Sequence, residues 1–188
     1  MDELIWELIR ASGVTGVVLL TVSVAMGISV NVRALDAFMK RAWVNEAHAF
    51  ASLLSLAMMV LHLTLVVANR HVPVSLAESL VPYLADWRPT AQAAGTVALH
   101  LSVVLVVSSY LKPAIGHRAW RAIHGGGFLC WAAAMSHGVT AGSDSDVVWM
   151  QYVYLLSFAT VMFLALFRVM APSRRSSRQV ERTLVTTR

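Results

Sequence analysis

Charged residues are scarce in this chain. They make up 13% of its 188 residues, whereas hydrophobic residues make up 57%, and the mean hydropathy is +0.65. Because an ordinary soluble domain is about 25% charged, this composition excludes such a domain and predicts a protein that is embedded in a membrane. Negative charge is scarcer than positive charge, since the chain has 10 acidic residues and 15 lysines and arginines.

The sequence also has few or none of three other features that would indicate particular classes of protein. The chain has a single cysteine, Cys130, which excludes an internal disulfide, and its apolar neighbours favour a packing residue over a nucleophile. The first residues, MDELIWE, are acidic, so we expect no cleavable signal peptide, which would start with basic residues. No glycine-rich nucleotide-binding loop occurs in the sequence, so we expect no nicotinamide or flavin site of that kind.

The chain has instead five long apolar stretches. Each contains the roughly 20 residues that a helix needs to cross the hydrocarbon core of a bilayer. The stretches are residues 11–32, 42–69, 89–111, 119–142 and 147–167. We therefore predict an all-α fold, a polytopic membrane bundle of about five transmembrane helices over residues 1–171. The polar residues 172–188 are expected to form a disordered cytoplasmic tail.

Basic residues gather at the ends of these stretches, on one side of the predicted membrane. Twelve of the 15 lysines and arginines fall on that side, and the other side has Arg10, Arg70 and Arg88. Because cytoplasmic loops carry the excess of lysine and arginine, we expect the N-terminus outside and the C-terminus in the cytoplasm. The same distribution accounts for the pI of about 10.0 without nucleic-acid binding. Thirteen of the 15 basic residues are arginines, which is typical of a high-GC bacterial genome. We expect a multi-pass protein of a bacterial inner (plasma) membrane.

Four histidines lie inside two of the apolar stretches. His48 and His62 belong to one stretch, and His124 and His137 belong to another, with nearly equal spacing within each pair. An ionisable side chain inside a bilayer is costly and is usually functional. Because a helix rises about 1.5 Å per residue, each spacing corresponds to roughly 20 Å of membrane depth.

The two stretches run in the same direction under this topology, so the histidines pair by depth. His48 pairs with His124 near the cytoplasmic side, and His62 pairs with His137 near the outer side, with depths that agree to about 1.5 Å. Two axial histidines fill both open positions of a haem iron and favour electron transfer. We therefore predict two haem b groups, an inner one on the first pair and an outer one on the second.

The spacing from His124 to His137 is one position shorter than that from His48 to His62, and it does not fit a straight helix. The longer spacing leaves two side chains about 40° apart around the helix axis, whereas the shorter one leaves about 140°. An ideal helix therefore does not aim both His124 and His137 at one partner. Residues 125–127 are three glycines, and we expect a π-bulge or a kink there that corrects the direction.

Haem propionates need cationic partners near the membrane surface. The candidates for the inner haem are Arg41, Arg118, Arg121 and His117, and those for the outer haem are Arg70, His71 and Arg88. The alternative is that these residues only follow the positive-inside rule and extend toward the lipid headgroups.

Three further residues of the apolar stretches have weaker signals. His100 lies at mid-depth in the third stretch and has no partner at matching spacing, so we expect it not to be a ligand but to hydrogen-bond within the bundle. Trp43 and Trp120 lie at the ends of their stretches and are expected to be interfacial anchors rather than electron relays.

Residues 71–88 form the one sizeable outer loop in this arrangement. Ser75 and Glu78 fit a capping box, which predicts a short amphipathic helix on the outer surface. Tyr83 and Trp87 are expected at headgroup level. The loop is either a plain connector or a lid over the outer cofactor or an electron acceptor.

These features together resemble a known family. The paired histidines, with residues 120–127 (WRAIHGGG) and 137–142 (HGVTAG), are similar to the ferric reductase-like transmembrane domain family over about residues 10–170. That family includes the membrane halves of NADPH oxidases and ferric reductases, and the haem subunit of bacterial methionine-sulfoxide reductase systems.

The resemblance implies a direction of electron flow and a ligand set. Electrons would pass from the cytoplasmic side outward through haems held by His48, His62, His124 and His137. Against the family pattern, we expect one span fewer than the usual six, and we expect no flavin- and nicotinamide-binding domain of the kind that follows in oxidases. We therefore expect a partner to donate the electrons, either a flavoprotein or membrane quinol.

The expected function is that of a diheme b-type membrane cytochrome. It would relay electrons from a cytoplasmic-side or membrane donor to an outer-side acceptor, such as ferric iron, oxygen or a periplasmic flavoprotein, and whether the chain is itself an enzyme depends on that acceptor. Two alternatives stay open, a single-haem quinol-linked subunit and a non-redox membrane anchor for a partner protein. An ion carrier is disfavoured because it usually needs carboxylates or broken helices in the middle of the membrane. Glu46, the carboxylate within the predicted spans, lies close to the cytoplasmic boundary.

Overall fold

Helices make up the regular structure of the residues that the structure describes. The structure, a computed structural model, describes residues 2–32, 39–69 and 74–170. The helices of this part are α1 (Asp2–Val32), α2 (Arg41–Ala68), α3 (Leu76–Leu80), α4 (Pro89–Tyr110), α5 (Lys112–His124), α6 (Gly127–Ala141) and α7 (Val148–Met170). The tail expected at 172–188 lies outside the described residues.

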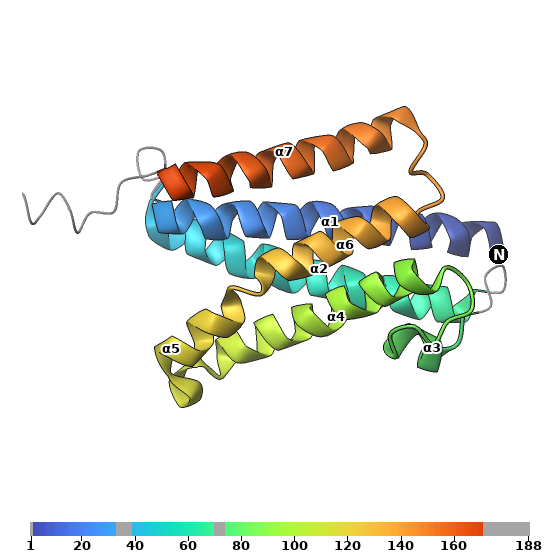
Figure 1. Cartoon of the computed structure of the whole chain (residues 1–188), viewed down its shortest axis with the longest axis horizontal. Helices are drawn as coiled ribbons and strands as arrows, with labels where there is room; N and C mark the ends of the chain where they lie inside the picture. Colours follow the sequence, from blue (N-terminus) through green and yellow to red (C-terminus); the bar gives the residue numbers. More distant parts are fainter. Residues whose placement is uncertain (1, 33–38, 70–73, 171–188) are drawn as a thin grey trace, which may run out of the picture.

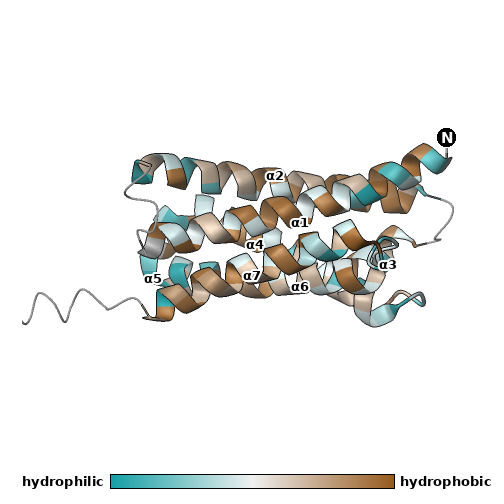
Figure 2. Ribbon diagram, turned by 90° about the horizontal axis from the view of Figure 1, so that it is seen from above, coloured by the Kyte–Doolittle hydropathy of each residue, from teal (hydrophilic) through white to brown (hydrophobic). Residues whose placement is uncertain are grey.

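Four of the described helices are long and apolar enough to cross a membrane. They are α1, α2, α4 and α7, and the shortest of them has 22 residues. Figure 2 shows apolar residues distributed along these helices, with more hydrophilic ones toward the ends of the bundle. Helices of this length and hydropathy indicate a multi-pass membrane protein, and they coincide with four of the five predicted spans.

The remaining predicted span, at residues 119–142, is not one continuous helix. It is divided between α5, which ends at His124, and α6, which begins at Gly127 and has 15 residues. The N–H of Gly126 donates to the carbonyl of Ile123 at 2.9 Å, a three-residue step that tightens the turn. The break therefore falls in the glycines where the sequence predicts a kink, while the count of five spanning helices stays a prediction.

The long helices lie side by side along the bundle (Figures 1 and 2). The chain direction alternates, so that α2 and α6 run one way and α1, α4 and α7 run the other. The N-terminus and α3 lie at one end of the bundle, and α5 and the last turn of α7 lie at the opposite end. These are termed the α3 end and the α5 end below.

A buried core fills the middle of the bundle. Its residues are Val17, Leu20, Ile28, Ala98, Cys130, Trp131, Ala134, Met135 and Val161. The indole N–H of Trp131 donates to the hydroxyl of Thr21 at 3.0 Å, and the Sγ of Cys130 lies 3.1 Å from the hydroxyl of Ser102. These bonds satisfy polar groups that would be costly if left unpaired in an apolar interior, and the full burial of Cys130 agrees with a packing role.

Small residues allow α1 and α2 to approach each other closely. The buried hydroxyl of Ser55 on α2 donates to the backbone oxygen of Gly16 on α1 at 3.0 Å. A side-chain hydroxyl can reach a backbone atom of a neighbouring helix only where no bulky side chain intervenes, as is common for helices that pack in lipid. This contact brings the backbone of α1 within reach of the histidines of α2.

The loop before α4 contains the predicted capping box. The backbone N–H of Ser75 donates to the carboxylate of Glu78 at 2.7 Å, and the N–H of Glu78 donates to the hydroxyl of Ser75 at 3.2 Å. These hydrogen bonds to Ser75 lower the pKa of Glu78 below its ordinary value. The hydroxyl of Thr96 on α4 donates to the carbonyl of Ser79 at 2.9 Å and so fastens the short helix α3 to α4.

An ion pair joins α1 to the loop between α6 and α7. The Nε of Arg10 donates to a carboxylate oxygen of Asp144 at 2.7 Å, and a second guanidinium nitrogen donates to Glu7 at 2.9 Å. The side chain of Asp144 is 15% exposed and that of Glu7 is 59% exposed. Because solvent screens the more exposed pair, the bond to Asp144 is the one expected to stabilise the fold.

The variant Asp144→Asn is expected to lower the free energy of unfolding by about 1–3 kcal/mol, because it weakens a charge-assisted bond to a half-buried guanidinium. Thermal unfolding in detergent, followed by tryptophan fluorescence, measures the change. Glu7→Gln is the matched control and is expected to change the stability by less than about 0.5 kcal/mol. Equal effects of the two variants would contradict this assignment.

Candidate functional site

Four histidines face one another in two pairs inside the bundle. Toward the α5 end, the ring centroids of His48 on α2 and His124 on α5 are 5.9 Å apart, with an angle of 81° between the ring planes. Toward the α3 end, the centroids of His62 on α2 and His137 on α6 are 6.2 Å apart, with an angle of 82°. The structure thus brings together the histidines that the sequence pairs by depth.

The separation within each pair suits a metal ion between the rings. Two imidazoles that bind one ion from opposite sides, each through a bond of about 2.0 Å, have ring centres about 6 Å apart. Within the described residues, no group of three or more histidine, cysteine, aspartate or glutamate side chains could hold a metal ion. Two opposed imidazoles alone therefore fit an ion that brings its own in-plane ligands, as the iron of a porphyrin does.

Three of the four rings are held by a backbone carbonyl of a neighbouring helix. The bonds join His48 Nδ1 to Ser23 O at 2.8 Å, His62 Nδ1 to Ile9 O at 2.9 Å, and His137 Nδ1 to Ala91 O at 2.8 Å. A carbonyl only accepts hydrogen bonds, so Nδ1 carries the proton in each ring. The Nε2 atom of each neutral ring is then unprotonated, which is the form that binds a metal.

A glycine lies beside each of these three rings, one helical turn after the carbonyl that holds it. The pairs are Gly27 with His48, Gly13 with His62, and Gly95 with His137. A Cβ atom at Gly95 would lie 2.7 Å from Nδ1 of His137, and one at Gly13 would lie 3.2 Å from the ring of His62. In a helix the N–H of that glycine bonds to the same carbonyl, so the missing side chain lets the imidazole reach the oxygen. The carbonyl and its glycine are termed a glycine notch.

The fourth ring, that of His124, is supported differently. Its Nδ1 atom is buried and has no hydrogen-bond partner among the described residues. The ring instead stacks on the indole of Trp120, with centroids 4.7 Å apart and an interplanar angle of 25°. The indole N–H of Trp120 donates to the hydroxyl of Ser109 at 3.3 Å. Trp120 therefore contacts a candidate ligand, in addition to the anchoring role that the sequence predicts.

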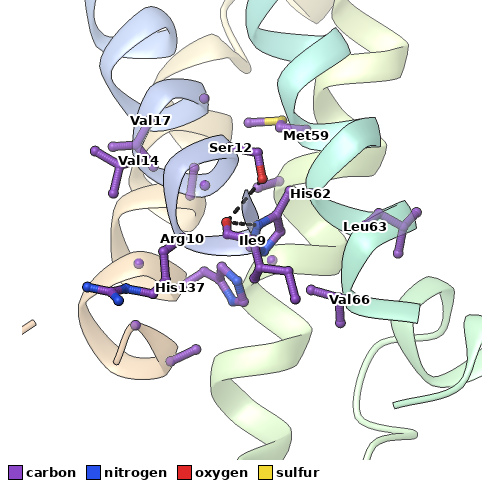
Figure 3. Close-up of a pocket in the computed structure, with 18 of the residues that line it drawn as sticks. Ile9, Arg10, Ser12, Val14, Val17, Met59, His62, Leu63, Val66 and His137 are labelled. Carbon is purple, nitrogen blue, oxygen red and sulfur yellow. Dashed lines mark hydrogen bonds between the residues drawn. The ribbon is translucent and has the colours of Figure 1, made fainter. Parts of the chain in front are cut away.

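A cavity of about 210 Å³ surrounds the pair at the α3 end. Figure 3 shows His62 and His137 turned into a common space between α1, α2, α4 and α6. Apolar side chains make up most of its wall, including those of Val14, Val17, Leu63 and Val66. Ser79 and Trp87 of the loop before α4 also line it. An apolar cavity with a few convergent polar groups is typical of a cofactor site.

The candidate propionate partners occupy exposed positions. Arg41 is the first residue of α2, and on α5 the guanidinium of Arg121 donates to Nε2 of His117 at 2.7 Å, with Arg118 beside them in the sequence. At the other end of the bundle, Arg88 donates to the carbonyl of Thr140 at 2.6 Å. Arg70 and His71 lie outside the described residues. Contact of any of these residues with a propionate stays a prediction.

His100 and Trp43 lie apart from the two pairs. His100 is in the middle of α4, and its side chain is exposed on the surface of the bundle. The sequence instead predicts that this side chain turns inward and forms a hydrogen bond within the bundle. Trp43 is 63% exposed in the first turn of α2, which agrees with an interfacial anchor.

Sequence reasoning missed the glycine notches, although one signal for two of them was present. Gly13 and Gly27 are separated on α1 by the same number of positions as His48 and His62 on α2. Because the two helices are antiparallel, this match predicts a glycine opposite each histidine. The sequence offers no matching pair of spacings for Gly95, and only the packing of α4 against α6 places this glycine beside His137.

Comparisons with known proteins leave the site to be interpreted from its geometry. No model of a known protein family, no curated protein and no solved structure matches the chain. The likeness to the ferric reductase-like family therefore stays a prediction from the sequence. The ring pairs, the glycine notches and the cavity are the observations on which a function is argued.

Proposed function

We propose that this chain is a membrane cytochrome that binds two b-type haems and relays electrons across the bilayer. The observation that carries the proposal is the presence of two histidine pairs, His48 with His124 and His62 with His137, each with the ring separation of a metal held between two imidazoles. Both pairs come from helices that run in the same direction, so they lie at two depths about 20 Å apart along α2.

The residues present fit haem at both positions. The notches of Ser23 and Ile9 on α1 and of Ala91 on α4 hold the rings with Nε2 unprotonated. When bound, each haem supplies an iron that accepts and releases one electron. Two histidines per haem would leave no open position for oxygen, which would favour electron transfer. The histidines keep this ligation rigid, since each anchored ring is fixed at Nδ1 and at its glycine.

A buried, mostly apolar core lies between the two pairs. Trp131 and Cys130 are buried there, and the partners of their polar atoms are other protein groups. In the proposed relay, electrons would cross the middle of the bundle through this core, whose described residues include one titratable side chain, that of Cys130. A core of this kind suits a one-electron relay across a membrane.

The direction of transfer follows from the distribution of charge. We propose that the α5 end, which has Lys112, Arg118 and Arg121, faces the cytoplasm, so that the N-terminus lies outside. A flavoprotein or membrane quinol then donates electrons at the inner pair, and an acceptor takes them at the outer pair. In this orientation Arg41 is a propionate partner of the inner haem, and Arg88 is one of the outer haem.

The loop before α4 acts in this proposal as a lid over the outer haem. Ser79 and Trp87 line the cavity around His62 and His137, and the hydrogen bond from Thr96 fastens the loop in place. The position of these two residues in the cavity wall supports the lid over a plain connector. The acceptor therefore approaches the outer haem past this loop.

A single-haem subunit is the second candidate, and one observation favours it. His124 is the one ligand of the four without a glycine notch, so the pair at the α5 end is held less firmly. In that case only the pair at the α3 end would retain haem. This reading differs from the first in the expected haem content and not in the chemistry of the occupied site.

The test is a reduced-minus-oxidised spectrum of the purified chain, with extracted haem measured per polypeptide. Two b-type haems per chain are expected, and one haem would favour the single-haem subunit. If protein made with adequate haem supply contained none, the cytochrome proposal would be wrong and a non-redox membrane anchor would replace it.

A further inference from the structure

The helix α5 presents a basic surface at its end of the bundle. Lys112, Arg118 and Arg121 lie on it together with His117, and residues 112–124 contain no acidic side chain. Gly116 has a positive φ of 78°, which divides the helix into two short parts. The basic residues Arg118 and Arg121 are exposed, so they are available to a partner of opposite charge.

A column of aromatic rings leads from this surface to the inner histidine pair. The ring of His117, which is exposed, stacks on Trp120 with centroids 5.4 Å apart and an interplanar angle of 28°. Trp120 stacks in turn on His124 at 4.7 Å. The ammonium of Lys112 lies 3.9 Å from the centroid of the Trp120 ring, a cation–π contact that holds the indole in place.

We infer that α5 is the docking surface for an acidic, water-soluble electron-donor protein. The inference rests on the proposed function and names the donor's chemistry and its point of entry. With a haem held by His48 and His124, the docked donor would lose one electron and the haem would gain it. No atom or proton is transferred in this step. The stacked rings of His117 and Trp120 fill the gap between donor and ligand and are not themselves oxidised.

The stack favours a protein partner over a lipid headgroup. Anionic lipids are attracted by lysine and arginine alone, and they need no ordered rings between the charges and His124. The bond from Arg121 to Nε2 of His117 fixes the outermost ring among the cations, so the same surface provides both charge complementarity and the start of the column. Charge attraction of this kind raises association rates by about 10- to 1,000-fold at low salt.

The test measures haem reduction by two donors in stopped-flow experiments. The haem-loaded chain is placed in nanodiscs of neutral phosphatidylcholine, and the probes are photoreduced flavodoxin, which is an acidic protein, and photoreduced deazariboflavin, which is small and uncharged. The quantity compared is the ratio of the two rates, each expressed per haem. For the double variant Arg118→Glu/Arg121→Glu, this ratio is expected to fall about 10-fold or more at low salt, and the fall is expected to shrink as salt is added.

Arg168→Glu is the matched control. Arg168 lies in the last turn of α7, at the α5 end of the bundle, and the variant makes one such arginine-to-glutamate substitution, half the charge change of the double variant, outside the docking surface. Its ratio is expected to stay within about twofold of the wild-type value. An equal fall in both variants would show a general charge effect and would overturn the proposal.

The column has a separate test. Trp120→Leu is expected to lower the limiting rate per haem at saturating flavodoxin, without changing the salt dependence, and Trp120→Phe is expected to restore most of the rate. An unchanged limiting rate for Trp120→Leu would remove the column from the proposal.

The remaining outcomes separate this inference from the proposed function. An unchanged ratio in the double variant, in a chain that holds two haems, would overturn the docking surface and leave the cytochrome proposal intact. If the double variant instead lost only its binding to vesicles containing phosphatidylglycerol, the surface would be a lipid contact. A chain without haem would fail the spectral test before either donor is used.

Discussion

The variant His62→Ala is expected to retain one haem per chain instead of two. If His62 and His137 hold a haem as proposed, the substitution would leave His137 as the one imidazole at the α3 end and weaken haem binding there. The inner pair lies about 20 Å away along α2 and keeps both imidazoles. Because sites this far apart behave independently, the absorbance of the reduced haem bands is expected to fall by about half. The measurement is extracted haem per polypeptide together with the reduced-minus-oxidised spectrum.

His100→Ala is the control for this experiment. His100 is also a histidine of a predicted membrane span, but it is exposed on the surface of the bundle, so its loss is expected to leave both haems in place. His48→Ala should reproduce the halved content by emptying the inner site instead. Two haems in His62→Ala, with the chain monodisperse, would show that His62 is not a ligand.

The second large effect, on haem affinity at the outer site, is expected from Gly95→Ala, which adds a single methyl group. In Gly95→Ala the new Cβ would lie 2.7 Å from Nδ1 and 2.9 Å from Cε1 of His137, which is closer than real Cβ contacts allow. The ring must therefore move away from the carbonyl of Ala91, and its 2.8 Å hydrogen bond is lost. Loss of a hydrogen bond that orients a ligand weakens metal affinity by about 10- to 100-fold. Haem titration of the apoprotein, followed at the Soret band, measures the change at the outer site.

Gly16→Ala is the matched control for the glycine notches. It makes the same substitution on α1, but the added Cβ would lie 3.6 Å from the nearest atom, in Met58, an ordinary packing distance. Haem affinity is expected to stay within about threefold of the wild-type value. Gly27→Ala, whose Cβ would lie 3.2 Å from His48, should weaken the inner site and spare the outer one. If Gly95→Ala and Gly16→Ala bound haem equally, the notch would have no role in positioning the ring.

Much of the architecture was predictable because periodicity and depth are local properties of a sequence. Runs of apolar residues locate α1, α2, α4 and α7, since crossing a bilayer requires about 20 of them in any fold. The same counting places His48 level with His124 and His62 level with His137, and the shorter spacing of the second pair along the chain predicts the break at the glycines after His124. The capping box of Ser75 follows from its position one helical turn before Glu78.

Hydropathy alone did not predict the division of the fourth span, because it does not register a change of helix direction, and only the spacing of His124 and His137 indicated the break. The stretch 119–142 is apolar throughout, yet α5 and α6 are separate helices on either side of Gly126. Glycine permits the break, but only the packing of α6 against α4 and α1 makes a bent path more favourable than a straight one. The same bend turns His124 toward α2 while leaving it beside Trp120.

By itself the sequence determined the all-helical class, four helices long and apolar enough to span a membrane, and the pairing of the four histidines by depth. The tertiary structure alone decided how each ring is held. The carbonyls of Ser23, Ile9 and Ala91 belong to helices other than those of the histidines, and every residue has a carbonyl, so no sequence pattern marks these three as acceptors. Which oxygen an imidazole reaches depends on how closely two helices pack, and that distance arises only when the whole bundle has formed.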